Sequence, residues 1–142
     1  MNHPHANHNS HHKNDHGHHQ KHHVVSTLLQ WTYGLLFIVA GADKFLNLIT
    51  QWAMYAGPYV LKLADAMTIM KVAGVIEIIV GLLILWKPRI GALIATIWLL
   101  LVAMNLITMG MYYDIAVRDI VIAIGALALY LMRTHCEEEM KK

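Results

Sequence analysis

The sequence contains little of what a water-soluble domain needs. Only 14% of its 142 residues are charged, whereas 57% are apolar. From Val24 to Met132 only short polar clusters interrupt the apolar residues. A soluble domain of this length would carry a polar face on most of its helices, and these segments mostly lack one. We therefore expect a single domain whose solvent is lipid rather than water.

Other absences exclude classes of function. The formal net charge is only +2, and no basic face is formed, so we expect no nucleic-acid partner. Cys136 is the only cysteine, which excludes an internal disulfide and a CxxC redox motif. No histidine lies within the apolar segments. A haem held between two buried imidazoles is therefore not expected.

Four segments are long and apolar enough to cross a bilayer, which takes roughly 20 helical residues. They cover residues 24–42, 68–86, 90–110 and 115–132. The short charged turn at 87–89 predicts an antiparallel hairpin of the second and third segments. We therefore predict an all-α fold, a four-helix transmembrane bundle over residues 24–134, followed by a charged C-terminal tail at 135–142.

The connection between the first two segments is unusual. Residues 45–67 are too many for a turn and too interrupted for a span, because Gly57 and Pro58 break the stretch. Trp52, Tyr55 and Tyr59 are residue types that favour the headgroup zone of a bilayer. We interpret 45–67 as an interfacial or re-entrant segment, with an ordinary loop as the alternative.

Lysine and arginine counts predict the orientation. With four spans, the two termini and the 87–89 turn share one side, which holds seven of these residues: Lys13, Lys21, Lys87, Arg89, Arg133, Lys141 and Lys142. The other side holds four. We expect an inner (cytoplasmic) membrane protein with both termini cytoplasmic. Alternatively, the small-x-small pattern at residues 40–42 is a signal-peptidase site, and cleavage there would leave three spans.

Glu77 is the clearest polar residue inside a span. An ionisable group in hydrocarbon costs roughly 2.5–3.5 kcal/mol on insertion scales. Glu77 shares a helical stripe with Gly74 and Gly81, and small residues mark where membrane helices approach closely. We therefore expect Glu77 to point into the bundle.

Similar stripes on the other spans predict a polar pocket at about the same depth. Its expected members are Asp43, Lys44, Glu77, Asn105, Arg118 and Asp119. With Lys71 as a further cation, we expect three positive charges (Lys44, Lys71 and Arg118) to balance three negative ones (Asp43, Glu77 and Asp119). Such a network satisfies part of its own desolvation cost. The network of polar residues has two possible roles. It either only fixes the helix register, or it forms a pocket for a quinone head group or a small anion, or a path for protons.

The first 23 residues form a different segment. Ten of the eleven histidines lie there: His3, His5, His8, His11, His12, His16, His18, His19, His22 and His23. A tract this polar cannot form a core, so we expect residues 1–23 to be disordered. Neutral imidazoles bind Zn, Ni or Cu. A pH-responsive or solubilising tail and a purification tag are the alternatives.

Three motifs in order resemble the DoxX-like family of small membrane proteins. They are GADKF at 41–45, Glu77 between two glycines, and Arg118-Asp119 opening the last span. The resemblance covers residues 24 to about 132. It implies a four-helix membrane bundle whose functional polar residues are Asp43, Lys44, Glu77, Arg118 and Asp119. One branch of that family is described as a subunit of thiosulfate–quinone oxidoreductase.

Three functional hypotheses follow. The first is an accessory subunit of a membrane oxidoreductase system that faces quinone and works with a soluble or membrane redox partner. The second is a metal-handling membrane protein that collects Zn, Ni or Cu on its histidine tail. The third is a structural adaptor without a ligand. No residue set indicates a reaction of the protein's own, the lipid bilayer is the one certain partner, and a homo-oligomer is compatible with the pattern.

Overall fold

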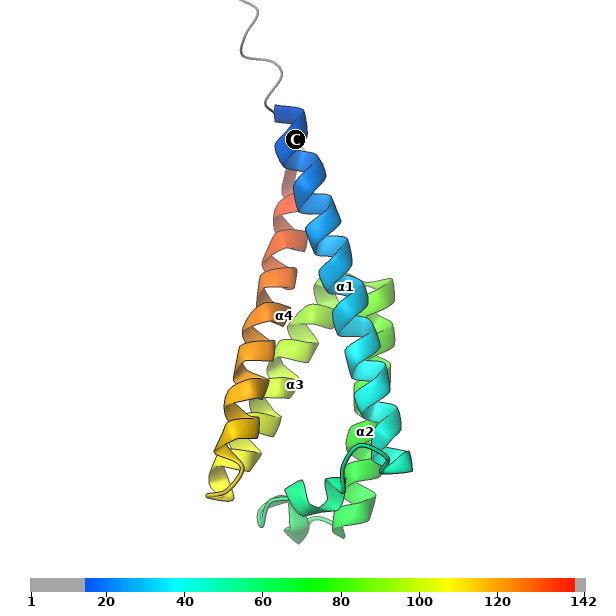
Figure 1. The fold of residues 1–142 in the computed structure, drawn as a ribbon, viewed down its shortest axis with the longest axis vertical. Coiled ribbons are helices and arrows are strands. Elements are labelled where there is room, and N and C mark those ends of the chain that lie inside the picture. Colours follow the sequence, from blue (N-terminus) through cyan, green and yellow to red (C-terminus); the bar gives the residue numbers. More distant parts are fainter. Residues whose placement is uncertain (1–14, 140–142) are drawn as a thin grey trace, which may run out of the picture.

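The computed structural model describes the backbone of residues 15–139 and the side chains of residues 24–135. Within this part of the chain there are four long helices and no strand (Figure 1). The long helices are α1 (Asp15–Leu46), α2 (Ala66–Trp86), α3 (Pro88–Thr108) and α4 (Tyr113–Glu139), with two 3-10 helices, η1 (Trp52–Tyr55) and η2 (Val60–Lys62), between α1 and α2. The predicted all-α fold is confirmed.

The bounds of the helices differ from those of the predicted spans. The helix α1 ends at Leu46 rather than at 42, so that Asp43 and Lys44 belong to its last turn. It begins at Asp15, and the backbone of 15–23 is therefore helical where we expected a disordered tail. Extending an existing helix is easier than nucleating one, so the apolar span explains this continuation. Residues 1–14 lie outside the described residues.

The turns between the helices follow simple local rules. The Asp65 carboxylate caps α2 by accepting a hydrogen bond from the Thr68 N–H at 3.0 Å, and this bond lowers the pKa of Asp65. Pro88 is the first residue of α3. Proline has no backbone N–H, and an N–H at this position would have no hydrogen-bond partner within the helix. Residues 135–139 of the expected C-terminal tail continue α4.

The four helices form two antiparallel pairs. The helix α1 packs mainly on α2, and α3 packs mainly on α4. The pairs meet towards the end that carries the termini and diverge towards the connection between α1 and α2 (Figure 1). Two contacts tie α1 to α4: the Tyr33 hydroxyl donates to the Ile122 carbonyl at 2.9 Å, and Arg133 donates to Gln30 at 2.6 Å.

Glycines hold α1 and α2 close together. A Cβ atom on Gly41 would lie 2.6 Å from the Gly74 carbonyl oxygen, and one on Gly81 would lie 2.8 Å from that of Gly34. The backbones therefore approach closely at two levels, as small residues allow in membranes. The α3–α4 pair uses buried alanines instead: Ala95, Ala103, Ala116, Ala123 and Ala126.

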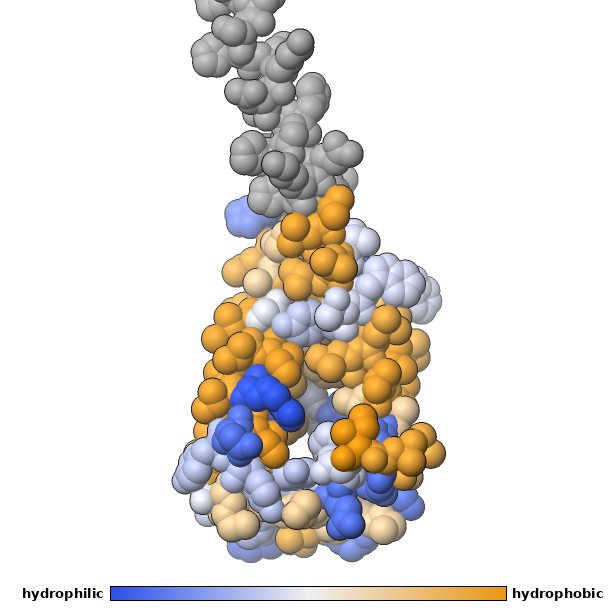
Figure 2. Space-filling view, in the orientation of Figure 1, coloured by the Kyte–Doolittle hydropathy of each residue, from blue (hydrophilic) through white to orange (hydrophobic). Residues whose placement is uncertain are grey.

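Large apolar side chains cover the outside of the bundle. Val39, Ile79, Ile97 and Ile124, one from each long helix, are 53–62% exposed. Figure 2 shows this apolar surface along both sides of the molecule. Each long helix contains a segment long and apolar enough to span a membrane. Because lipid is the only solvent in which this surface is favourable, the chain is a multi-pass membrane protein.

The glycine contacts give a first prediction. Gly74→Val should destabilise the bundle by about 1–3 kcal/mol, since overpacking at a close helix contact forces the backbones apart. Thermal unfolding in detergent, followed by helical circular dichroism, measures the change. Val75→Ile, on the exposed neighbouring position, is the matched control and should behave as wild type. An equal loss in both variants would contradict the close approach.

Candidate functional site

Residues 47–65, here called the connecting segment, fold across the end of the bundle where the helix pairs diverge (Figure 1). The Asp43 carboxylate anchors the start of this segment. It accepts hydrogen bonds from the backbone N–H groups of Leu48 and Ile49 at 2.9 and 3.0 Å, and from the Trp52 indole at 2.6 Å. Asp43 is only 4% exposed, so these three donors replace the water it has lost.

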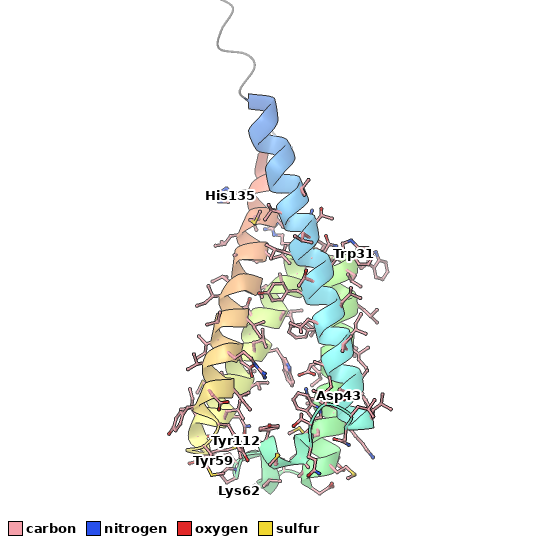
Figure 3. The ribbon with its side chains drawn as sticks, in the orientation of Figure 1. Trp31, Asp43, Tyr59, Lys62, Tyr112 and His135 are labelled. Atoms are coloured by element: carbon pink, nitrogen blue, oxygen red, sulfur yellow. The ribbon has the colours of Figure 1, made fainter. Side chains whose placement is uncertain are left out.

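The connecting segment is anchored to α3 as well. The Asn105 amide donates to the Tyr55 carbonyl at 2.9 Å, and the Tyr55 ring packs edge-on against Tyr112 with centroids 4.9 Å apart. Gly57 lies so close to the Asn105 side chain that a Cβ there would collide with Oδ1. The connecting segment thus bridges the two helix pairs, and Figure 3 shows Asp43 and Tyr112 on opposite sides of this bridge.

Lys44 and Glu77 form a buried ion pair between α1 and α2. The Lys44 Nζ lies 2.6 Å from Glu77 Oε2, and both residues are 8% exposed. The Trp98 indole donates to Glu77 Oε1 at 3.3 Å. The Lys44 ammonium also lies over the Trp52 ring, 3.8 Å from its centroid, which adds a cation–π contact. Both carboxylate oxygens of Glu77 are therefore paired.

The direction of helical side chains explains why these two residues meet. The glycine contacts place Lys44 at the level of Gly74, because a Cβ on Gly74 would lie 3.1 Å from the Lys44 Cβ, so Glu77 lies about one turn along α2 from the level of Lys44. Side chains lean towards the N-terminus of their own helix. In an antiparallel pair, two side chains lean towards each other when each residue lies on the C-terminal side of the level of the other, as Lys44 and Glu77 do. The Lys44 side chain is long enough to span the remaining distance.

Asp119, on α4, is buried as well and is 8% exposed. Its Oδ1 lies 3.7 Å from the Nε of Arg118, whose side chain is 62% exposed. We call Lys44, Glu77 and Asp119 the charged cluster.

The predicted pocket residues therefore divide into three groups. Lys44 and Glu77 come together as expected, and Asp119 is buried as they are. Asp43 and Asn105 instead hold the connecting segment, and Asp43 does not pair with a cation. Arg118 is largely exposed, and Lys71 is exposed and takes no part in the cluster. Lys71 lies one turn into α2 on its outward face, which explains why the expected charge balance does not include it.

Two tryptophans belong to the site and were missed as site residues. Trp98 lies on the same stripe of α3 as Asn105, so the helical spacing could have identified it. Trp52 lies in the irregular connecting segment, where no periodicity indicates a side-chain direction. Both indoles donate to carboxylates, at Glu77 and Asp43 respectively.

The space between the helix pairs is open near the connecting segment (Figure 2). Figure 2 shows the surface hollowed between the two pairs, above the connecting segment. We call this hollow the opening. Both apolar and strongly hydrophilic residues border it (Figure 2), and such a border suits a polar head attached to an apolar tail. A catalytic arrangement is not evident from these groups.

The predicted metal ligands lie elsewhere. His3, His5, His8, His11 and His12 are outside the described residues, and only the backbone is described for His16, His18, His19, His22 and His23. Within the described side chains, no group of three or more His, Cys, Asp or Glu residues could hold a metal ion. The metal prediction for the tail therefore stays a prediction.

The buried ion pair gives the second prediction. Lys44→Met or Glu77→Gln alone should destabilise the protein by about 3–5 kcal/mol, because each leaves the partner unpaired in the interior. The double variant should lose clearly less than the sum of the two. Thermal unfolding in detergent measures all three, and exposed Lys71→Met is the control. Strictly additive losses would show that the two side chains do not interact.

No family model, curated protein or solved structure matches this chain. The resemblance to the DoxX-like family therefore rests on the three motifs alone and stays a prediction. The function has to be inferred from the charged cluster, the opening and the connecting segment.

Proposed function

We propose that this membrane protein binds the head group of a lipid-soluble quinone in the opening, and that it serves as an accessory subunit of a membrane oxidoreductase system. The observation that carries the proposal is the charged cluster, buried where two apolar helix pairs diverge. Buried charges are expensive in a membrane, and they are commonly found where a substrate or proton is handled.

The chemistry of the site fits a quinone in either oxidation state. Such a molecule has a flat ring, polar oxygens at opposite edges and an apolar tail. The indoles of Trp52 and Trp98 supply flat apolar faces, and the charged cluster supplies polar contacts. The surrounding surface is apolar (Figure 2), so a tail could remain in lipid while the head reached the charged cluster.

An accessory role follows from the side chains available. The chain has one cysteine, and the one histidine within the candidate spans is His135, at the end of the fourth, so the bundle's own side chains offer no set of ligands typical of an electron carrier. Electrons would come from a soluble or membrane partner with its own redox centre. This protein would then contribute a quinone site.

The location is part of the same proposal. Lysines and arginines are concentrated on the side of the termini and the α2–α3 turn, and this asymmetry favours the cytoplasm for that side. The opening and the connecting segment would then lie nearer the outer face of the inner membrane.

Quinone binding is the third prediction. Titrating the purified full-length protein with a short-tailed benzoquinone, and with its quinol, should quench tryptophan fluorescence saturably in at least one oxidation state. Glu77→Gln should weaken this binding about tenfold or more, since it removes the charge that positions Lys44 and Trp98. Lys71→Gln should bind as wild type.

Two outcomes would decide against this function. Absence of saturable binding of either oxidation state by the wild-type protein would refute it. If Glu77→Gln lowered the unfolding temperature but left binding unchanged, the charged cluster would only fix the helix register, as the structural alternative holds.

Metal handling by the histidine tail is a second candidate. The observation in its favour is the concentration of ten histidines within residues 3–23, five of which lie on the helical extension of α1 from Asp15.

The fourth prediction tests this candidate. The full-length protein should bind Zn, Ni or Cu ions in isothermal titration calorimetry, and replacing all ten tail histidines by asparagine should abolish most of that binding. Replacing His135 alone, which is exposed near the end of α4, should change little. If cells that carry the variant with all ten histidines replaced kept their metal content and metal tolerance, a metal-handling role would be contradicted.

A further inference from the structure

We infer that the contact between the connecting segment and the α3–α4 pair is a releasable latch, and that its release widens the opening and admits a ligand from the lipid. Tyr55, Gly57, Asn105 and Tyr112 form this contact, and we call them the latch. The release concerns the fold alone, whereas the entry of a ligand rests on the proposed function.

The two helix pairs are firmly joined at the end that carries the termini. The Tyr33 hydroxyl donates to the Ile122 carbonyl there, and Arg133 donates to Gln30. Buried apolar residues from all four long helices form one core cluster: Phe37, Val80, Ile84, Ala92, Ala95, Ala126 and Leu129. This end of the bundle is therefore a fixed joint between the pairs.

The shared core stops before the connecting segment is reached. A second cluster contains buried residues of α3 and α4 only, namely Ala103, Leu106 and Ala116, and Tyr55 packs against it. The Trp98 indole still reaches Glu77 on α2, but Asn105 lies about two helical turns further along α3. Among the described residues, the hydrogen bond and the ring contact that join the pairs beyond Trp98 are those of the latch.

The connecting segment belongs to the α1–α2 pair. It runs from the end of α1 to the start of α2, and both of its 3-10 helices contact α2. The Asp43 carboxylate holds it through the N–H groups of Leu48 and Ile49 and the Trp52 indole. Hydrogen bonds to an ionised group are roughly twice as strong as neutral ones. The segment should therefore stay with α1 and α2 when the latch opens.

The latch is held by weaker interactions. Its one hydrogen bond is neutral, from the Asn105 amide to the Tyr55 carbonyl at 2.9 Å. The Asn105 Oδ1 is buried and has no hydrogen-bond partner among the described residues, which is unfavourable for a polar atom. The remaining contact is the edge-on packing of Tyr55 against Tyr112. The latch is thus the contact that should release first.

Release of the latch would act on the opening. The pairs would stay joined at the end with the termini and separate at the other end, as in a hinge motion. A ligand with an apolar tail could then enter sideways from the bilayer, between the pairs. When only a minor state admits a ligand, the apparent binding falls with the population of that state. Weakening the latch should therefore speed entry.

Spin labels on pairs of introduced cysteines measure the separation of the helix pairs. The full-length protein is studied in liposomes, with its only cysteine replaced by serine. Labels at Val72 and Val117 lie near the starts of α2 and α4, and labels at Leu82 and Leu131 lie nearer the termini; all four side chains are exposed. Asn105→Leu should lengthen and broaden the first distance and leave the second unchanged.

Two further variants complete the distance measurement. Gly57→Ala should act like Asn105→Leu, because a Cβ at Gly57 would collide with the Asn105 Oδ1. Met104→Leu, at the exposed neighbour of Asn105, is the matched control and should keep both wild-type distances. A first distance that is unchanged in both latch variants, or two distances that change together, would overturn the inference.

The rate of ligand entry tests the second part. Stopped-flow quenching of tryptophan fluorescence by a short-tailed benzoquinone, or by its quinol, gives the association rate constant. Asn105→Leu should raise it severalfold, and Met104→Leu should leave it as in the wild type. An unchanged rate beside a lengthened distance would overturn the control of entry by the latch. If the wild type bound neither ligand, the proposed function would fall, and the distances would still decide whether the latch exists.

Discussion

The ion pair between Lys44 and Glu77 is the interaction on which the rest of the site depends. In a bilayer neither charge can be hydrated, and each is tolerable only because the other lies 2.6 Å away. The pair fixes the end of α1 against the middle of α2. From that position Lys44 reaches the Trp52 ring and Glu77 reaches the Trp98 indole, so the pair links the connecting segment and α3 to the first helix pair.

The arrangement of the two helix pairs forms the site. Glycines bring α1 and α2 together, and alanines bring α3 and α4 together, so each pair is compact on its own. The pairs are tied to each other through Tyr33 and Gln30 and diverge beyond these contacts. Divergence creates the opening, and the connecting segment closes its end through Asp43 and Asn105. Close contacts of Gly91 with Ile84 and of Gly125 with Tyr33 hold the pairs together away from the connecting segment, and the site lies where the pairs have diverged.

Much of this architecture could be predicted from the sequence. Long apolar segments set the number of spans, and the helical stripe of Gly74, Glu77 and Gly81 correctly predicted that the carboxylate points inwards. Helix periodicity carries this information, because it relates spacing to direction.

The errors occurred where periodicity gives no direction. Asp43 was expected to balance a cation, but it binds backbone N–H groups of the connecting segment, whose path depends on irregular backbone geometry such as the positive φ of Asn47. Trp52 was missed for the same reason. Lys71 was predicted to belong to the network, and this prediction was wrong. Lys44 is the residue that reaches Glu77, because the glycine contacts set the register between α1 and α2.

The central claim is that this ion pair exists inside the bundle in a lipid bilayer. Solid-state NMR on the full-length protein in liposomes, with the Lys44 side-chain nitrogen and the Glu77 carboxyl carbon labelled, measures it directly. A strong dipolar coupling between the two labels, lost in Glu77→Gln, is the result that this structure predicts. A coupling of the Lys44 nitrogen to lipid acyl chains or headgroups, with none to Glu77, would contradict it.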